Sequence, residues 1–413
     1  MNKNFFKQKR KQIAKALPKN SLLALSSYPK FLRQVDVYYP YRQESYFYYL
    51  TGFKQEESLF LLFSSSHSVL FIKDKDFKKE IWDGIVYNVD EVKEKYGIDE
   101  VLTLSQMDLF FSKKIKGIKH VFYNKGLKQF DKKIKSLNIK FQSAYEFLRP
   151  FRQIKSLAEI QSLKKACSYS IQAHKEVAKV LKPGSNERAL HAVFIHSIMK
   201  QGAQREAYPG IFASGKNALI LHYIKNNSVC KKGDLLLVDA GAESDYYASD
   251  ITRVYPVNGK FSKKQKQIYQ LLLKLQKQLI NYVKPGVSLK TLNEKMSIGL
   301  TEILLEIGLL TGSFKENLVS QKYKSYCPHS VGHFLGLDVH DVFKKGDSVL
   351  KENMVLTIEP GIYIDSKDKK APQALRGLGL RIEDDILVTK SGSSNLSIQL
   401  AKESDEIEEL CSL

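Results

Sequence analysis

Residues 235–255 read LLLVDAGAESDYYASDITRVY and place two carboxylates inside strand-forming sequence. Four apolar residues lead directly into Asp239, and Asp250 follows eleven positions later in a second stretch of β-propensity. A hairpin centred between Ser244 and Asp245 would set Asp239 directly opposite Asp250. Such cross-strand neighbours have Cβ atoms about 5 Å apart, where like charges repel. We therefore predict that this segment folds as a hairpin whose acids hold a metal ion.

A second pair of acids lies in strand-like sequence further along the chain. TIEPGIYI carries Glu359 and LRIEDDILV carries Glu383, and the intervening loop of Lys, Asp, Gly and Pro suits a long β connection. Between the two pairs, HSVGHFLGLDVHD places three of the nine histidines within twelve residues. His333 can supply a nitrogen ligand. Four carboxylates and one imidazole form a hard, oxygen-rich set that suits two divalent ions of manganese, cobalt, iron or zinc.

Each of these residues also has a purely structural interpretation. A lone acid beside a turn, such as Asp245, is usually a turn residue. Glu359 before Pro-Gly is open to the same interpretation, and Glu383 with its two acidic neighbours could form a solvated face. The histidines on expected helices are interpreted as packing or surface residues: His174, His191 and His196. Five potential ligands in strand contexts nevertheless favour a metal centre, because unrelated structural needs rarely produce such a set.

The chain length of 413 residues predicts two domains. Residues 1–150 mix short apolar strands with charged helical stretches, which indicates an α/β domain. Pro150 breaks regular structure, and from Ile154 to Leu181 apolar residues recur at helical spacing, which predicts a long amphipathic helix. We expect the second domain to occupy residues 151–413.

The second domain contains an internal duplication. One expected helix ends in VLKPGSNERAL and another in YVKPGVSLKTL, with Pro183 and Pro285 separated by 102 residues. Each is followed by a further helix and then by β-rich sequence that holds acids and histidines. The pattern predicts a duplicated α+β half-domain that closes around a central site.

Composition narrows the range of partners. The formal charge of +21 would attract nucleic acid, but the lysines are scattered and no nucleic-acid-binding signature is present, so we expect no nucleic-acid partner. No apolar run approaches the roughly 18 residues of a membrane span, and the N-terminus lacks a secretory signal, so we expect no membrane partner. The widely spaced cysteines form no CxxC pair and fit a reducing cytoplasm: Cys167, Cys230, Cys327 and Cys411.

Five segments resemble the metal-ligand motifs of the pita-bread metallopeptidases, family M24B: LLLVDAGAE, SDITRVYPV, HSVGHFLGLDVHD, TIEPGIY and LRIEDD. Within that family the sequence is most similar to the aminopeptidase P group. The segment YPYRQESYFYYLTGF resembles that group's N-terminal signature, so the likeness covers nearly the whole chain. It implies an α/β N-terminal domain followed by an α+β pita-bread catalytic domain. The loop 365–379 departs more freely from the pattern and leaves substrate preference open.

The resemblance implies two divalent ions, with manganese expected first. Asp239 would bind one ion, Asp250 and Glu383 would bridge both, and His333 with Glu359 would complete the second site. Such ions lower the pKa of bound water and so supply a hydroxide near neutral pH. Glu359 would take the proton of the attacking water and pass it to the departing proline nitrogen.

Four other residues are implied in catalysis by the same resemblance. His222 in ILHY, together with His329 and His340, would contact the substrate or the transition state. A hydrogen bond from His340 would stabilise the oxyanion of the tetrahedral intermediate. Arg381 would orient Glu383 from behind the metal ligands.

The expected activity is that of an Xaa-Pro aminopeptidase, which removes the first residue of a peptide with proline second. The bond before proline is a tertiary amide with a fixed φ, which ordinary peptidases accommodate poorly. A prolidase, which takes only dipeptides, is the nearest alternative, and the N-terminal YPYRQ segment argues against it. Methionine aminopeptidases normally lack so large an N-terminal domain. A non-catalytic pita-bread binding protein would be expected to lose ligands, whereas all five are present here.

The N-terminal signature is rich in tyrosine, and most of these rings are interpreted as core and interface packing: Tyr38, Tyr39, Tyr41, Tyr46, Tyr48 and Tyr49. In relatives, N-terminal residues line the site entrance or reach a neighbouring subunit. Asp36, Arg42 and the only tryptophan, Trp82, match such positions. They imply a homodimer or homotetramer.

Overall fold

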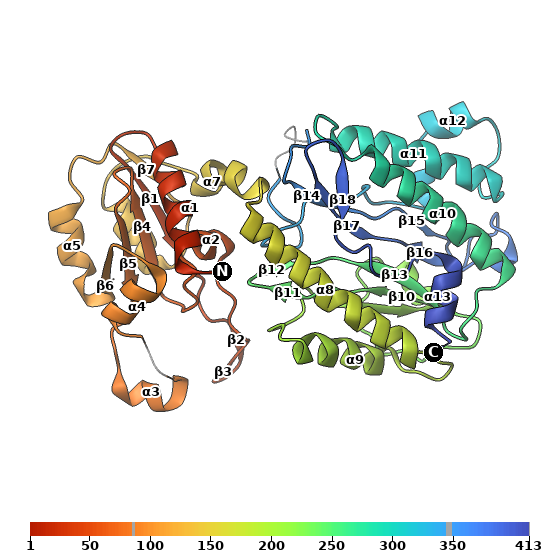
Figure 1. Cartoon of the computed structure of the whole chain (residues 1–413), viewed down its shortest axis with the longest axis horizontal. Coiled ribbons are helices and arrows are strands. Elements are labelled where there is room, and N and C mark those ends of the chain that lie inside the picture. The colour runs from red at the N-terminus through yellow and green to blue at the C-terminus, as the bar shows by residue number, and fades with distance from the viewer. Residues whose placement is uncertain (85–86, 344–348, 413) are drawn as a thin grey trace. The chain divides into compact units, whose positions relative to one another are not determined.

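The structure is a computed structural model that describes residues 1–84, 87–343 and 349–412. The chain forms two compact units, Met1–Phe151 and Arg152–Leu413 (Figure 1). Among the described residues, no helix is both long and apolar enough to cross a membrane.

The N-terminal unit is built on a six-stranded mixed sheet. In sheet order the strands are β6 (Glu100–Thr103), β5 (Ser68–Ile72), β4 (Leu59–Phe63), β1 (Ser21–Ser26), β7 (His120–Phe122) and β8 (Phe141–Gln142). The helices are α1 (Lys3–Ala16), α2 (Ser45–Thr51), α3 (Phe77–Asp83), α4 (Val89–Tyr96), α5 (Met107–Lys114), α6 (Lys128–Lys135) and α7 (Ala144–Gln153). Strand β4 pairs antiparallel with β1 and β5, whereas β7 runs parallel to β1.

The central strands of this sheet are apolar on both faces because helices cover them. Every residue of β1, SLLALS, is buried. Leu22 and Leu61 lie in a cluster with Phe110 of α5 and Phe130 of α6, so these two helices pack on one face. The unit is therefore an α/β domain, as predicted.

The tyrosine-rich segment divides into a buried and an exposed part. Tyr46, Tyr48 and Tyr49 of α2 are buried. By contrast, the short hairpin of β2 (Leu32–Gln34) and β3 (Val37–Tyr38) is exposed throughout. Asp36 lies at the turn of this hairpin and is exposed, Arg42 is partly buried, and Trp82 of α3 is 87% exposed.

The second unit consists of two halves, each with a helix pair and a three-stranded antiparallel sheet (Figure 1). The first half contains α8 (Leu157–Val180), α9 (Glu187–Lys200), β9 (Ile211–Ser214), β10 (Leu235–Asp239), β11 (Glu243–Ser244), β12 (Tyr247–Ala248) and β13 (Thr252–Pro256). The second contains α10 (Lys263–Tyr282), α11 (Leu289–Glu306), α12 (Phe314–Val319), β14 (Val355–Ile358), β15 (Gly361–Tyr363), β16 (Gly379–Arg381), β17 (Asp384–Val388), β18 (Ser393–Asn395) and α13 (Ser404–Leu410). The predicted duplicated half-domain is confirmed.

One apolar core unites the two halves. It includes Val177 of α8 and Leu237 of β10 from the first half, and Leu272 of α10 and Leu356 of β14 from the second. All four side chains are at most 1% exposed. The halves therefore share one interior, and the acidic strand ends lie at its edge.

Helix α8 begins later than its apolar period suggested. The expected helix started at Ile154, but the observed one starts at Leu157. Ser156 and Glu159 form a capping box: the Ser156 N–H and hydroxyl donate to Glu159 Oε2 at 2.8 and 2.7 Å. This cap fixes the helix start, and Leu157 is left 77% exposed although it fits the period.

The first hairpin also has a different register from the predicted one. Asp239 pairs with Thr252, not with Asp250, so the expectation that the two acids lie directly opposite was wrong. Asp245 and Tyr246 have φ values of 50° and 69° and form the turn, which is therefore centred one residue later along the chain than predicted. Asp250 lies two residues before Thr252, so the two acids are diagonal neighbours on the same face.

Candidate metal centre

One cavity in the second unit, of about 480 Å³, is lined by all nine residues predicted for the site. They are Asp239, Asp250, His333, Glu359 and Glu383, together with His222, His329, His340 and Arg381. The sequence separates these residues by up to 161 positions (222 to 383). The fold brings them together because the strands of both halves end at this cavity.

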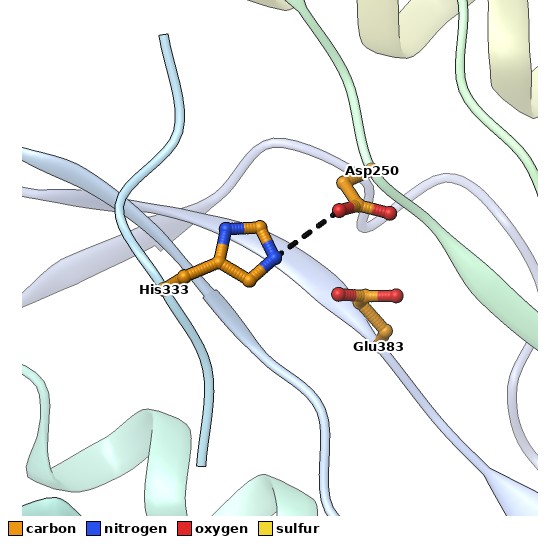
Figure 2. Close-up of side chains that lie close together, drawn as sticks. All are labelled: Asp250, His333 and Glu383. Atoms are coloured by element: carbon orange, nitrogen blue, oxygen red, sulfur yellow. Dashed lines mark ion pairs between the residues drawn. The ribbon is translucent and has the colours of Figure 1, made fainter. Parts of the chain in front are cut away.

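Three of the residues form a cluster that could hold a metal ion. Asp250, His333 and Glu383 each offer one ligand atom, and these atoms all lie within 4.8 Å of one another (Figure 2). His333 Nε2 lies 3.3 Å from Asp250 Oδ2 and 3.7 Å from Glu359 Oε1. Asp250 lies two residues before β13, His333 lies in a loop, and Glu383 directly precedes β17.

Strand pairing explains why acids of the two halves meet. Thr252 and Glu383 form an isolated antiparallel bridge between the halves, and the Thr252 hydroxyl donates to Glu383 Oε2 at 2.6 Å. In the second half, Ile358 pairs with Asp384 at the end of the β14–β17 ladder. Glu359 and Glu383 are the next residues beyond that pair, so backbone register places them side by side.

The imidazole of His333 is oriented by a backbone carbonyl. Its Nδ1–H donates to Phe334 O at 3.1 Å, which leaves Nε2 facing the acids. The His333 N–H donates to Thr357 Oγ1 at 3.1 Å and fixes the backbone. Metal-binding histidines are commonly held in this way, with one ring nitrogen bonded to the protein and the other free to bind.

The buried acids carry more negative charge than the nearby cations balance. Burial, reinforced by the charges of Asp250, Glu359 and Asp239, raises the pKa of Glu383 well above its usual value. Burial likewise raises the pKa of Glu359 to about 7. Burial pushes the pKa of His333 downward, but Asp250 and Glu359 outweigh it and raise that pKa to about 9. A divalent cation would offset the same repulsion, so the donor set fits a metal centre.

Arg381 has a different partner from the one that the resemblance implied. Its guanidinium donates to Asp239 Oδ2, and its Nε–H donates to Thr252 Oγ1 at 3.2 Å. The Thr252 hydroxyl in turn donates to Glu383. Arg381 therefore contacts Asp239 directly and reaches Glu383 through Thr252.

The three other histidines differ in their surroundings. His329 Nδ1 lies 2.9 Å from Ser330 O and its Nε2 lies 3.0 Å from Tyr363 Oη, and burial lowers the pKa of His329 to about 4. Burial and the charge of His333 lower the pKa of His340. His222 and His340 are exposed in the cavity, where a ligand can reach them.

Two tyrosines complete the site, and the sequence did not point to either. The Tyr208 hydroxyl lies 2.7 Å from Asp239 Oδ1 and 2.5 Å from Asp250 Oδ1, between the two acids of the first half. The Tyr363 hydroxyl accepts from Arg381 at 2.8 Å. Neither tyrosine belongs to a charge pattern or a hydrophobic period in the sequence. Each contacts the site only through the tertiary fold, so the sequence offered no signal for it.

His174 is a buried packing residue, in agreement with the interpretation from the sequence. Its Nε2 lies 3.1 Å from Ala240 O and its Nδ1 lies 3.2 Å from the Tyr255 hydroxyl. Burial lowers the pKa of His174 to about 3. The ring therefore stays neutral and supports the strand end behind Asp239.

Comparison with known proteins identifies the family. The sequence pattern of metallopeptidase family M24 matches residues 161–390, and that of the aminopeptidase P N-terminal domain matches residues 6–123. The chain belongs to metallopeptidase family M24. Xaa-Pro aminopeptidase from Haemophilus influenzae is 34% identical over 99% of this chain and 97% of its own length. Human Xaa-Pro aminopeptidase 3 is 36% identical over 94% of this chain and 80% of its own length.

Solved structures of this family share the whole fold. Aminopeptidase P from Escherichia coli with the inhibitor Pro-Leu superposes with a TM-score of 0.96 at 33% identity, covering 100% of this chain and 98% of that one. A zinc-substituted form of the same enzyme in complex with product gives a TM-score of 0.95 over the same share of both chains. The pita-bread fold and the membership of the aminopeptidase P group are thereby confirmed.

Proposed function

We propose that this chain is an Xaa-Pro aminopeptidase that removes the N-terminal residue from peptides with proline in second position. The observation that carries the proposal is the convergence of Asp250, His333 and Glu383, from both halves of the fold, in one cavity. The relatives named above, which are similar to this chain over nearly its whole length, carry that activity in their names.

The metal centre is proposed to hold two divalent ions. Asp239, Asp250, His333, Glu359 and Glu383, which line the same cavity, would hold the ions. Manganese is our first choice, with cobalt, iron and zinc as alternatives, because all four accept mixed carboxylate and imidazole ligands. When bound, such ions polarise a carbonyl group and make water a better nucleophile.

The side chains around the ions have roles that follow from their charge and position. Glu359 lines the cavity and is proposed as the general base that takes the proton of the attacking water and later acts as an acid. His222 and His340 are proposed to donate hydrogen bonds to the substrate or to the oxyanion. His329 supports them from a neutral imidazole held by Tyr363. Arg381 fixes the orientation of Asp239.

The shape of the cavity supports a short peptide with a proline ring. Its walls include apolar side chains that can accept a ring without backbone hydrogen bonds: Pro209, Ile211, Leu221, Ile224 and Val339. The bond before proline has no N–H to donate, so recognition by shape is required. The acidic end of the cavity would attract the free amino group of the substrate, which limits cleavage to the first residue.

Two further properties, the compartment and self-association, are proposed. All four cysteines are free thiols, which fits a reducing compartment such as the cytoplasm. The exposed β2–β3 hairpin, with Phe31 61% and Tyr39 55% exposed, and the exposed Trp82 support self-association as a homodimer or homotetramer. Sedimentation velocity of the full chain and of Trp82→Ala tests the second property.

The deciding experiment is hydrolysis of Xaa-Pro-Yaa peptides by chelated protein refilled with single metals. We expect activity to return with manganese or cobalt and to stay absent in Asp250→Ala, which loses a proposed bridging ligand. Equal turnover by the chelated protein would refute the metal mechanism. Comparing Xaa-Pro with Xaa-Pro-Yaa in the same assay separates an aminopeptidase from a prolidase, because a prolidase cleaves only the dipeptide.

A further inference from the structure

A buried carboxylate outside the catalytic cavity organises one of its walls. Glu187, the first residue of α9, is fully buried and accepts five hydrogen bonds. Its Oε1 accepts from the Ser214 N–H and hydroxyl, both at 2.7 Å, and from Asn217 Nδ2 at 2.9 Å. Its Oε2 accepts from the Tyr223 hydroxyl and from the Ser228 N–H, both at 2.8 Å.

All five donors are neutral, and no ion pair of Glu187 occurs among the residues that the structure describes. Burial pushes the pKa of Glu187 upward, but the hydrogen bonds outweigh it and the pKa lies below its usual value. The side chain is therefore a carboxylate anion at neutral pH. A buried carboxylate without a cation is stable only when hydrogen-bond donors surround it, so the fold must hold all five donors in position.

The donors share one origin, since all of them belong to residues 214–228. This segment begins at the last residue of β9 and carries three residues of the cavity wall, Leu221, His222 and Ile224. Tyr223 lies between them in sequence but is buried, and its hydroxyl ends at Glu187. Glu187 thus anchors the residue next to His222, and His222 lines the cavity.

A second anchor holds the segment through Asn226. Asn226 is buried, accepts from the Phe212 N–H at 3.0 Å and donates to Gly210 O at 2.8 Å. The segment is therefore tied to β9 at Asn226 and to α9 at Tyr223.

We propose that Glu187 is a positioning residue for His222, which it holds toward the substrate by fixing residues 214–228. This inference rests on the proposed function, in which His222 contacts the substrate. Replacement by glutamine keeps the size of the side chain but places an NH₂ group against donors, so the segment must rearrange. Displacements of about 1 Å at a catalytic site can lower kcat/KM about a hundredfold.

The test is a double-mutant cycle on hydrolysis of an Xaa-Pro-Yaa peptide by manganese-loaded protein. We expect Glu187→Gln to lower kcat/KM by about ten- to a hundredfold. If Glu187 acts through His222, the double variant Glu187→Gln/His222→Ala is within about twofold of His222→Ala alone. The proposal would be overturned if the losses of kcat/KM in Glu187→Gln and His222→Ala multiplied in the double variant, or if Glu187→Gln left kcat/KM unchanged.

Glu159→Gln is the matched control. Glu159 is also a buried glutamate in the first turn of a helix, but it accepts hydrogen bonds from Ser156 and Tyr247, which lie outside residues 214–228. We expect any effect of Glu159→Gln to multiply with that of His222→Ala. If Glu187→Gln fails to fold, Tyr223→Phe removes one donor, keeps the ring and enters the same cycle with a smaller loss.

Hydrogen exchange supplies a readout that does not depend on activity. We expect faster amide exchange within residues 214–228 of Glu187→Gln, with no such change in Glu159→Gln. Unchanged exchange in that segment would overturn the proposal even if the wild-type protein cleaved no peptide. An inactive wild type with faster exchange in the variant would instead refute the proposed function and leave the positioning role supported.

Discussion

Metal binding to the acidic cavity should release protons, and the structure predicts how many. In the metal-free protein at pH 7, pKa values of about 9 and about 7 leave one proton on His333 and about half a proton on Glu359, and the raised pKa of Glu383 adds to this uptake. Each of these groups must lose its proton to bind a metal ion. Loading with Mn²⁺ at pH 7 should therefore release at least about 1.5 protons per chain.

Isothermal titration calorimetry measures this number directly. Mn²⁺ is titrated into chelated protein in several buffers of equal pH but different ionisation enthalpy, and the slope of heat against ionisation enthalpy gives the protons released. At pH 8.5 the number should be lower, because Glu359 has already lost its proton in the metal-free protein. The variant Asp250→Ala serves as the control for release at other sites. A binding heat that does not depend on the buffer would refute this description of the site.

Three further predictions concern stability and packing. Folding lowers the pKa of His174 from 6.5 to about 3, so the unfolded chain takes up a proton before the folded protein does as the pH falls. The wild type should therefore lose about 2 kcal/mol of unfolding free energy between pH 7 and 5, a loss that His174→Gln should not show. Urea titrations at both pH values check this, and equal losses in the two proteins would contradict it. Gly332→Ala would place a Cβ 2.0 Å from the backbone oxygen of Thr357 in β14, next to His333, so calorimetry should show weaker Mn²⁺ binding and a lower Tm. The control Gly392→Ala, which has open space around it, should match the wild type in both measurements. Asp384→Asn leaves the buried Arg253 without its charge partner at 2.7 Å and should cost about 3–5 kcal/mol in urea unfolding; wild-type stability would argue against this ion pair.

The sequence was sufficient to predict which residues meet, because strand propensity and acid spacing are local signals. Asp239 ends β10 and Glu359 directly follows β14, whereas Asp250 lies two residues before β13 and Glu383 lies directly before β17. The duplication then required both sets to share one site. Burial of the acids in a common cavity follows from this pattern, and the structure places all of them there.

The contacts within the site could not be predicted from the sequence, because they depend on backbone geometry. The register of the first hairpin is set by the positive φ angles of Asp245 and Tyr246, which the letters alone do not specify. The shift from Asp250 to Thr252 opposite Asp239 gives Thr252 its place between Arg381 and Glu383. A single turn residue thus decides which side chains link the two halves.

Anomalous diffraction from crystals grown with Mn²⁺ tests the dinuclear centre most directly. Data collected on both sides of the manganese absorption edge should show two peaks in the cavity of the second unit. The peaks should be surrounded by the five proposed ligands: Asp239, Asp250, His333, Glu359 and Glu383. A cavity without peaks, or with a single peak that contacts acids of only one half, would contradict the claim that the two halves converge around a pair of metal ions.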